Sequence, residues 1–209
     1  MKKKELEKIG KELSRRLPGF TAKGDLVVMC PINTVLRGIC FDGSGFDKRG
    51  FYVQVFFLPL CTPTHELYFS MGQRLRTLGH NPGQMWSIDM PGLADELEEA
   101  VRKDALPFLA KAESLESMID VLKTSAKTNF YGLRAMAYSL ARLGRFTEAV
   151  EELSRAVAML GTRNWEVDLA VEASQLKKDI LENPELALAR LERWESETRT
   201  ALKLDRFCD

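Results

Sequence analysis

The spacing of apolar residues changes near the middle of the chain. Up to residue 90, short runs rich in Val, Phe, Tyr and Leu alternate with turn-forming clusters, a pattern typical of β-strands. After residue 91, apolar residues recur every three or four positions, the spacing of an amphipathic helix. The sequence therefore predicts an α+β protein, with a sheet domain at residues 1–90 and an all-helical region at residues 91–209.

The first half is expected to begin with a helix and continue as a sheet. Residues 2–17 place four apolar side chains on one stripe, and Pro18-Gly19 ends the helix. Strands are expected at residues 25–30, 35–41, 51–60 and 66–71, and their short connections predict an antiparallel four-stranded meander. The run at residues 51–60 is apolar at both alternating sets of positions, so it is predicted to be a central strand covered by a helix on at least one side.

The second half is expected to be helical throughout. A link at residues 73–90 contains the turn signal His80-Asn81-Pro82-Gly83, and a helix then begins after Pro91 and breaks at Pro107. Ser114 is a suitable cap for a helix at residues 115–123. A final pair is expected at residues 165–181 and 184–204, with the side chain of Asn183 as its cap, and the tail beyond residue 204 is expected to be loose.

Residues 129–162 predict two short helices folded back on each other at Gly144. Large and small apolar residues alternate on both helices, at Leu133, Met136, Ala137, Leu140, Ala149, Leu153 and Ala156. With Gly144 and Phe146 at the turn, this stretch resembles a single tetratricopeptide repeat. It departs from that family where Gly161 replaces the helix-ending Pro, and no second clean copy follows. An ordinary helical hairpin is the alternative interpretation.

The repeat resemblance implies a binding surface. The first helix of such a hairpin faces the concave side, where the family holds its peptide, and in this chain that face carries Tyr131, Arg134, Tyr138 and Arg142. Tyrosine and arginine supply much of the binding energy at protein interfaces. In the alternative interpretation, the tyrosines pack against the helix at residues 115–123 and the arginines pair with glutamates of the next helix.

The first part of the chain carries a second resemblance. An amphipathic helix, a short meander, the strand FYVQVFFLPL, a Trp and a helix ending Ala-Leu-Pro-Phe-Leu follow one another within residues 1–125. This order resembles a bacterial domain family of unknown function that is associated with toxin and immunity loci. The resemblance implies a non-catalytic protein that occludes a cognate toxin with a complementary charged surface.

Charge and composition narrow the classes of partner. The chain has 30 basic and 30 acidic residues and a formal net charge of zero, which gives no general argument for nucleic-acid or membrane-surface binding. No apolar stretch approaches the roughly 20 residues of a membrane span, and the charged N-terminus lacks the apolar core of a secretory signal. A cytoplasmic location is therefore predicted. The cysteines, at positions 30, 40, 61 and 208, are widely spaced and are expected to be free thiols.

Catalytic and metal-binding motifs are weak. His65-Glu66 begins like a zinc-protease motif but Phe69 stands where the second histidine is required, so no metal site and no cofactor are predicted. Cys61, four residues before His65, is a candidate nucleophile, although such pairs usually come from distant segments of the chain. A buried structural thiol is the alternative.

Three functions follow from the sequence. The first is an immunity-type inhibitor that binds a cognate bacterial toxin. The second is a repeat-like adaptor that binds a peptide or a second copy of the chain through its C-terminal helices. The third is an enzyme with an unrecognised site. The sequence favours the first, a protein-binding protein without catalytic activity.

Overall fold

The computed structural model describes residues 3–77, 85–125 and 130–208, so the turn predicted at His80-Asn81-Pro82-Gly83 lies outside the described residues. The chain divides into two compact units. Unit 1 comprises Met1–Phe57, Gly72–Lys111 and Leu204–Asp209, and unit 2 comprises Leu58–Met71 and Ala112–Lys203. These units differ from the predicted ranges 1–90 and 91–209, because the first helices after Pro91 bury their apolar residues in the core of the sheet.

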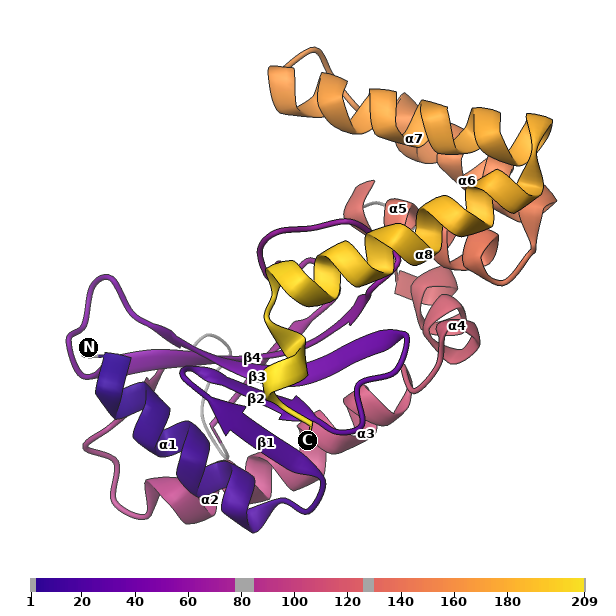
Figure 1. The fold of residues 1–209 in the computed structure, drawn as a ribbon. Helices are drawn as coiled ribbons and strands as arrows, with labels where there is room; N and C mark the ends of the chain where they lie inside the picture. Colours follow the sequence, from indigo (N-terminus) through magenta and orange to yellow (C-terminus); the bar gives the residue numbers. More distant parts are fainter. Residues whose placement is uncertain (1–2, 78–84, 126–129, 209) are drawn as a thin grey trace. The chain divides into compact units, whose positions relative to one another are not determined.

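Unit 1 is built on an antiparallel sheet, which together with the helices that follow confirms the α+β fold class (Figure 1). Its main strand order is β1-β2-β3-β4-β5, and β6 also pairs with β4. The strands are β1 (Phe20–Lys23), β2 (Leu26–Met29), β3 (Val35–Gly43), β4 (Gly50–Pro59), β5 (Gln73–Leu75) and β6 (Trp86–Ser87).

The strand content differs from the prediction at three places. The run at residues 66–71 is not a strand in the structure. The two short strands β5 and β6 instead come from the predicted link, where they pair with Val53–Val55 and with Gly50 and Phe51 of β4. β1 also escaped prediction, because its four residues are mostly half-buried and show no apolar alternation. Apolar composition alone did not separate a strand from an irregular segment that is mostly half-buried or exposed.

The core of unit 1 lies on one face of this sheet. Phe51, Val53 and Val55 of β4 alternate along that face, as the sequence predicts for a central strand, and all three are fully buried. The helices α1 (Lys3–Arg16) and α2 (Leu93–Ala100) contribute Leu6, Leu13 and Leu97 to the same core. At the helix surface, Arg16 of α1 pairs with Asp95 and Glu98 of α2.

Pro107 does not break the helix that follows α2. The chain continues through the π-helical segment η1 (Val101–Ala105) into α3 (Leu106–Ala110). A proline has no N–H to donate and its ring crowds the carbonyl of the residue four positions earlier, here Lys103. Widening the preceding turn to the π form accommodates this change, and the helix keeps Val101, Ala105 and Leu109 in the core.

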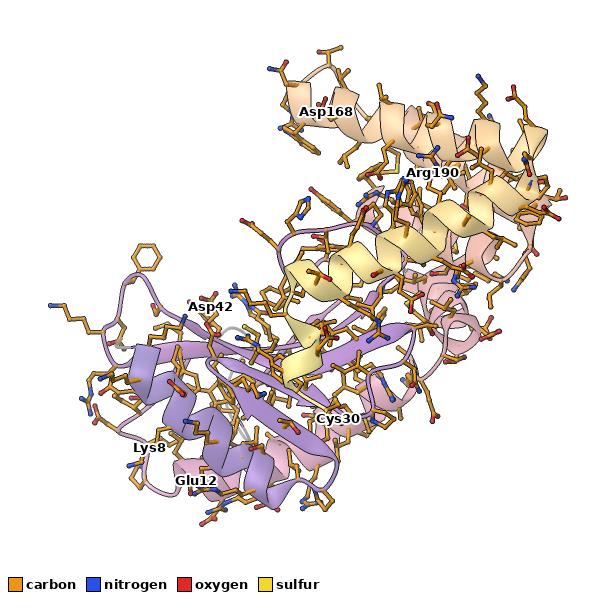
Figure 2. All side chains as sticks on the ribbon, in the orientation of Figure 1. Lys8, Glu12, Cys30, Asp42, Asp168 and Arg190 are labelled. Atoms are coloured by element: carbon orange, nitrogen blue, oxygen red, sulfur yellow. A yellow bond between two sulfur atoms is a disulfide. The ribbon has the colours of Figure 1, made fainter. Side chains whose placement is uncertain are left out.

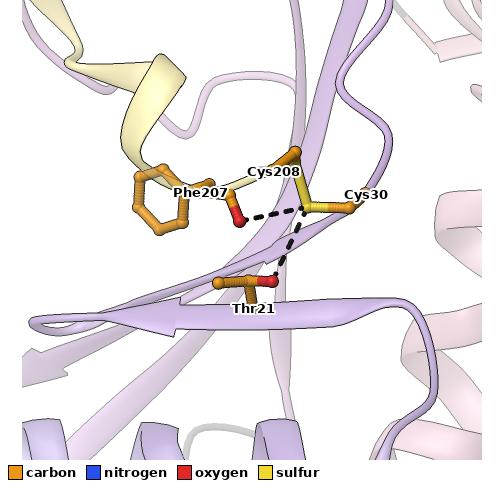
Figure 3. The surroundings of a disulfide bond; sticks show 4 residues. All are labelled: Thr21, Cys30, Phe207 and Cys208. Atoms are coloured by element: carbon orange, nitrogen blue, oxygen red, sulfur yellow. Dashed lines mark hydrogen bonds between the residues drawn. A yellow bond between two sulfur atoms is a disulfide. The ribbon is translucent and has the colours of Figure 1, made fainter.

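The C-terminal segment belongs to unit 1 and is ordered, contrary to the expected loose tail. Leu204 and Phe207 are buried, and Cys208 forms a disulfide with Cys30, 178 residues earlier (Figure 3). The Sγ of Cys30 lies 3.7 Å from the hydroxyl of Thr21, which can donate a hydrogen bond to it. The prediction of four free thiols is wrong for this pair, because sequence spacing gave no indication that the two segments meet. The cysteines of this chain therefore no longer support the prediction of a cytoplasmic location.

In the described residues, unit 2 consists of five helices and the segment Leu58–Met71, which begins with the last two residues of β4 and continues as a loop. The helices are α4 (Leu115–Ser125), α5 (Phe130–Arg142), α6 (Phe146–Ala158), α7 (Asn164–Glu182) and α8 (Pro184–Ala201). Successive helices from α4 to α8 pack on each other, and α8 also packs on α5. None of the helices in the described residues is long and apolar enough to span a bilayer.

The hairpin of α5 and α6 forms where the sequence predicts it. Gly144 adopts a φ of 74°, a left-handed conformation that ends α5, and the N–H of Arg145 donates to the carbonyl of Leu140. Ala137, Ala149 and Ala156 have no exposed surface, so the two helices approach closely at small residues. This confirms a helical hairpin, and membership of the repeat family stays a prediction.

α7 and α8 form a second antiparallel pair. Asn183 caps α8 by accepting a hydrogen bond from the N–H of Leu186, and Pro184 follows as the first helical residue, as predicted. Arg190 of α8, labelled in Figure 2, donates to the buried carboxylate of Asp179 on α7 at 2.5 Å. The pair is therefore held partly by an ionic contact between its two helices.

Candidate functional site

The four residues predicted to form a binding surface lie on α5 in different environments. Tyr138 is fully buried and Arg134 is only 4% exposed, so neither is open to a partner. Tyr131 is half-buried, and 27% of the Arg142 side chain is exposed. The predicted surface therefore differs from the structure at its two central residues, Arg134 and Tyr138.

Arg134 and Tyr138 converge on one carboxylate of α7. Glu172 Oε1 accepts from Arg134 Nη2 at 2.5 Å and from the Tyr138 hydroxyl at 2.6 Å. Arg134 also donates to the carbonyl of Pro63 in the segment Leu58–Met71. Burial raises the pKa of the Tyr138 hydroxyl above its ordinary value and the nearby Glu172 carboxylate adds to this, so the hydroxyl stays a hydrogen-bond donor at neutral pH.

Aromatic contacts cover the same face of α5. Tyr138 stacks on Trp194 of α8 with the ring centroids 5.5 Å apart, and Tyr131 lies against Tyr68 at the same distance. The alternative interpretation expected the tyrosines to pack against α4 and the arginines to pair with glutamates of α6. In the structure the aromatic contacts come from α8 and Tyr68, and the glutamates come from α7 and α8. A pattern on one helix could not identify which later segment covers it.

Arg142 is the most accessible of the predicted arginines. Its guanidinium lies 3.6 Å from the carboxylates of Glu192 and Glu195, both on α8. These contacts are longer than a good charge-assisted hydrogen bond and the glutamates are partly in solvent, so each contributes little to stability. Arg142 therefore lies near α8 and forms only weak ionic contacts with it.

Cys61 and His65, the candidate nucleophile and its partner, lie in the segment Leu58–Met71 of unit 2. Cys61 is fully buried, and this burial raises the pKa of its thiol to about 12. His65 is exposed, and among the described residues no hydrogen bond joins the two side chains. A thiol with this pKa carries almost no thiolate at neutral pH, which opposes a nucleophilic role. Across the described ranges, no three His, Cys, Asp or Glu side chains are grouped to hold a metal ion.

An open groove lies instead on another side of the hairpin, between α4, α5 and α6. It has a volume of about 710 Å³. Its floor is apolar and consists of Leu122, Leu133 and Met136, and Ala158 and Met159 at the end of α6 form one wall. Lys123, Glu152 and Arg155 supply its charged residues. We refer to these eight residues as the unit 2 groove.

Glu152 is the polar group within this groove. Its Oε1 accepts a hydrogen bond of 2.9 Å from the exposed Arg155, whereas its Oε2 is buried and has no hydrogen-bond partner among the described residues. A buried carboxylate oxygen without a partner is unfavourable, and such groups in folded proteins usually have a ligand, an ion or water beside them. Because Oε2 is buried, it can accept a hydrogen bond from an occupant of the groove only when the Glu152 side chain turns to expose it.

Sequence reasoning identified parts of the groove without recognising it. Leu133 and Met136 were assigned as packing residues of a repeat, and the sequence pattern cannot show that their outer side stays uncovered. The one available signal was the continuation of apolar residues beyond the hairpin at Met159, which is 45% exposed. In the part of the chain that the structure describes, large exposed apolar residues are concentrated in unit 2, at Met159, Trp165, Val167, Val171, Leu181 and Leu186, with Phe46 in unit 1.

Comparisons with protein-family models, with curated proteins and with solved structures found no match to this chain. The two resemblances stated from the sequence, to a tetratricopeptide repeat and to a domain of toxin and immunity loci, therefore stay predictions.

Proposed function

We propose that the protein is a protein-binding protein whose unit 2 groove receives an apolar segment of its partner. The observation that carries this proposal is the open apolar floor of the groove, beside which Glu152 Oε2 has no hydrogen-bond partner among the described residues. The partner segment would carry apolar side chains and at least one N–H donor. Such a segment would remove the apolar floor from water, and Glu152 Oε2 would gain a hydrogen bond once the side chain turns towards the segment.

The composition of the groove fits this occupant. Met136 and Met159 are flexible and polarisable, and methionines are common on surfaces that accept apolar side chains. Lys123 and Arg155 are exposed and form a polar border at the apolar groove. Protein interfaces commonly have such a polar rim around an apolar centre. A basic donor on the partner segment is favoured next to Glu152, because a charge-assisted hydrogen bond is stronger than a neutral one.

Within this class, we propose an immunity-type inhibitor that binds a cognate bacterial toxin. What supports this finer proposal is the resemblance of residues 1–125 to the toxin and immunity family. An adaptor that binds a peptide is the second candidate, favoured by the hairpin of α5 and α6 beside the groove. The exposed apolar residues of α7, Val167 and Val171, extend the area that a larger partner could cover.

The test compares two charge insertions on α6. Ala158→Arg places a long cation in the groove, and Thr147→Arg places the same cation on an exposed position of the helix outside it. The full chain would be used to isolate a stoichiometric partner from a lysate, and the purified partner would then be titrated calorimetrically against each variant. We expect Ala158→Arg to weaken binding by about tenfold or more and Thr147→Arg to change it less than about twofold.

Equal affinity of the two variants would overturn the groove as the contact surface. The failure of any partner to bind stoichiometrically would overturn the protein-binding function itself. The partner's own activity separates the two candidates, because a toxin loses its activity when an immunity protein binds, whereas the ligand of an adaptor does not.

A further inference from the structure

A cavity of unit 1 brings together four cationic side chains. It has a volume of about 580 Å³. One side is formed by β5 and the residue after it, and the other side by the helical segment from η1 to just past α3. Arg74 and Arg76 come from the first side, and Lys103 and Lys111 from the second. Among the described residues, Asp104 is the one carboxylate in its lining, so these side chains carry a local charge of +3. We refer to this as the cationic cavity.

The helical side of the cavity depends on the π segment described above. Lys103, Pro107 and Lys111 are spaced four residues apart, and all three are exposed along one side of the helix. Pro107 widens the turn that carries Lys103 and Asp104. Widened turns of this kind occur frequently at functional sites. Pro107, which was expected to end a helix, therefore shapes the wall of the cavity.

The strand side of the cavity holds one arginine in a fixed orientation. In the sheet, Arg74 of β5 pairs with Gln54 of β4, and its guanidinium lies 4.2 Å from the centre of the Tyr52 ring. Stacking on an aromatic face leaves the N–H groups at the edge of the guanidinium free to donate. Tyr52 thus orients Arg74 without using its hydrogen bonds.

None of the four cations is neutralised within residues 3–77, 85–125 and 130–208. Arg74, Arg76, Lys103 and Lys111 form no ion pair there, although other arginines of unit 1, such as Arg16 and Arg49, do. Like charges that surround a hollow raise the potential inside it and attract an anion. The four unpaired cations therefore stabilise a bound anion, and they contribute little to the stability of the protein when the cavity is empty.

We propose that the cationic cavity binds a small polyphosphate, the chemical class that includes nucleoside polyphosphates. The forked donors of Arg74 and Arg76 suit phosphate oxygens, and the two lysines supply point charges at the opposite side. The cavity volume lies within the range of about 300–1,000 Å³ that is usual for small-molecule sites. A hollow of this size favours a small ligand over an extended nucleic acid, whose backbone requires a longer cationic track.

The direct test is calorimetric titration of the full-length protein with inorganic tripolyphosphate and with ATP. We expect binding that weakens as salt is raised, because the contacts are ionic. The variant Arg74→Gln with Lys103→Gln removes one cation from each side of the cavity. We expect it to lower the affinity for tripolyphosphate by about tenfold or more, with an unchanged melting temperature of the ligand-free protein, since both side chains are exposed.

The matched control removes one lysine and one arginine from α1 of the same unit. Lys8, labelled in Figure 2, and Arg15 are both exposed and lie outside the cationic cavity. Lys8→Gln with Arg15→Gln lowers the net charge by the same amount, and we expect it to change the affinity by less than about twofold.

Three results would overturn the proposal. One is the absence of binding to either probe up to about 1 mM. Another is an equal loss of affinity in the cavity variant and the α1 variant, which would indicate attraction by overall charge. The last is tighter binding of an oligothymidylate whose affinity rises with its length, which would assign the cations to single-stranded nucleic acid instead.

Discussion

In the described residues, arginine side chains are unpaired in the cationic cavity of unit 1 and paired with carboxylates in the interior of unit 2. In unit 2, Arg134 and Arg190 are each held by a carboxylate at 2.5 Å, and these contacts join α7 to its neighbours. In the cavity, Arg74 is stacked on an aromatic ring and no described carboxylate pairs with it. A paired, buried cation fixes structure, whereas an unpaired cation beside a hollow is available to a ligand. Four variants compare the two units, from the largest expected effect to the smallest.

The largest effect is expected from the covalent link, which lies in unit 1 alone. Cys208→Ser removes the closure of a loop that spans 178 residues, and we expect the free energy of unfolding to fall by about 4 kcal/mol. Hydrogen exchange followed by mass spectrometry should show the loss of protection in unit 1 rather than in unit 2. Cys40→Ser, at a free cysteine of the same sheet, is the control. Unchanged stability of Cys208→Ser without reductant would mean that the disulfide does not hold the tail.

A smaller loss is expected when the buried arginine of unit 2 loses its partner. Glu172→Ala leaves Arg134 buried without a counterion and removes the acceptor of the Tyr138 hydroxyl. We expect a loss of about 3 kcal/mol in the free energy of unfolding, measured by urea denaturation. Glu151→Ala, at an exposed position of α6, should change it by less than about 0.5 kcal/mol.

Lys103→Gln extends that experiment to the cationic cavity. This exposed cation has no ion pair to lose, so its removal should change the free energy of unfolding by at most about 0.5 kcal/mol. If Lys103→Gln destabilised the protein as much as Glu172→Ala does, the contrast between the two regions would be wrong.

The smallest effect is a dependence on pH at the start of α7. Hydrogen bonds from Arg163 lower the pKa of the Glu166 carboxyl from its ordinary 4.5 to about 2. A lowered pKa in the folded state stabilises the fold above pH 4.5, and this contribution is lost as the pH falls towards 2. Glu166→Gln should therefore reduce the fall in melting temperature across this window. Glu151→Gln is the control, and identical curves for Glu166→Gln and the unchanged protein would contradict the assignment.

The elements were more predictable from the sequence than their neighbours. The hairpin at Gly144 and the cap at Asn183 were predicted correctly, because a left-handed glycine and a helix cap are decided by a few adjacent residues. The apolar residues on both faces of β4 were likewise sufficient to identify a central strand. Local chemistry specified these features.

The features that depend on distant segments could not be predicted in this way. Tyr138 has the composition of an interface residue, and only the position of Trp194, 56 residues later, shows that it is buried. The zero net charge of the chain concealed the cationic cavity, because a sum over all residues does not record which charges lack a partner. Two of the four predicted binding residues, Arg134 and Tyr138, are therefore buried even though their helix was correctly identified.

The division of the chain has a consequence for its synthesis. Unit 1 is interrupted twice by unit 2, and its last segment, Leu204–Asp209, is translated after all five helices of unit 2. Unit 2 is completely synthesised before the ribosome reaches Leu204. The sheet of unit 1 is synthesised early, but unit 1 is incomplete until its C-terminal segment follows. Completion of unit 1, including the oxidation of Cys30, is thus a late event in the biogenesis of the protein.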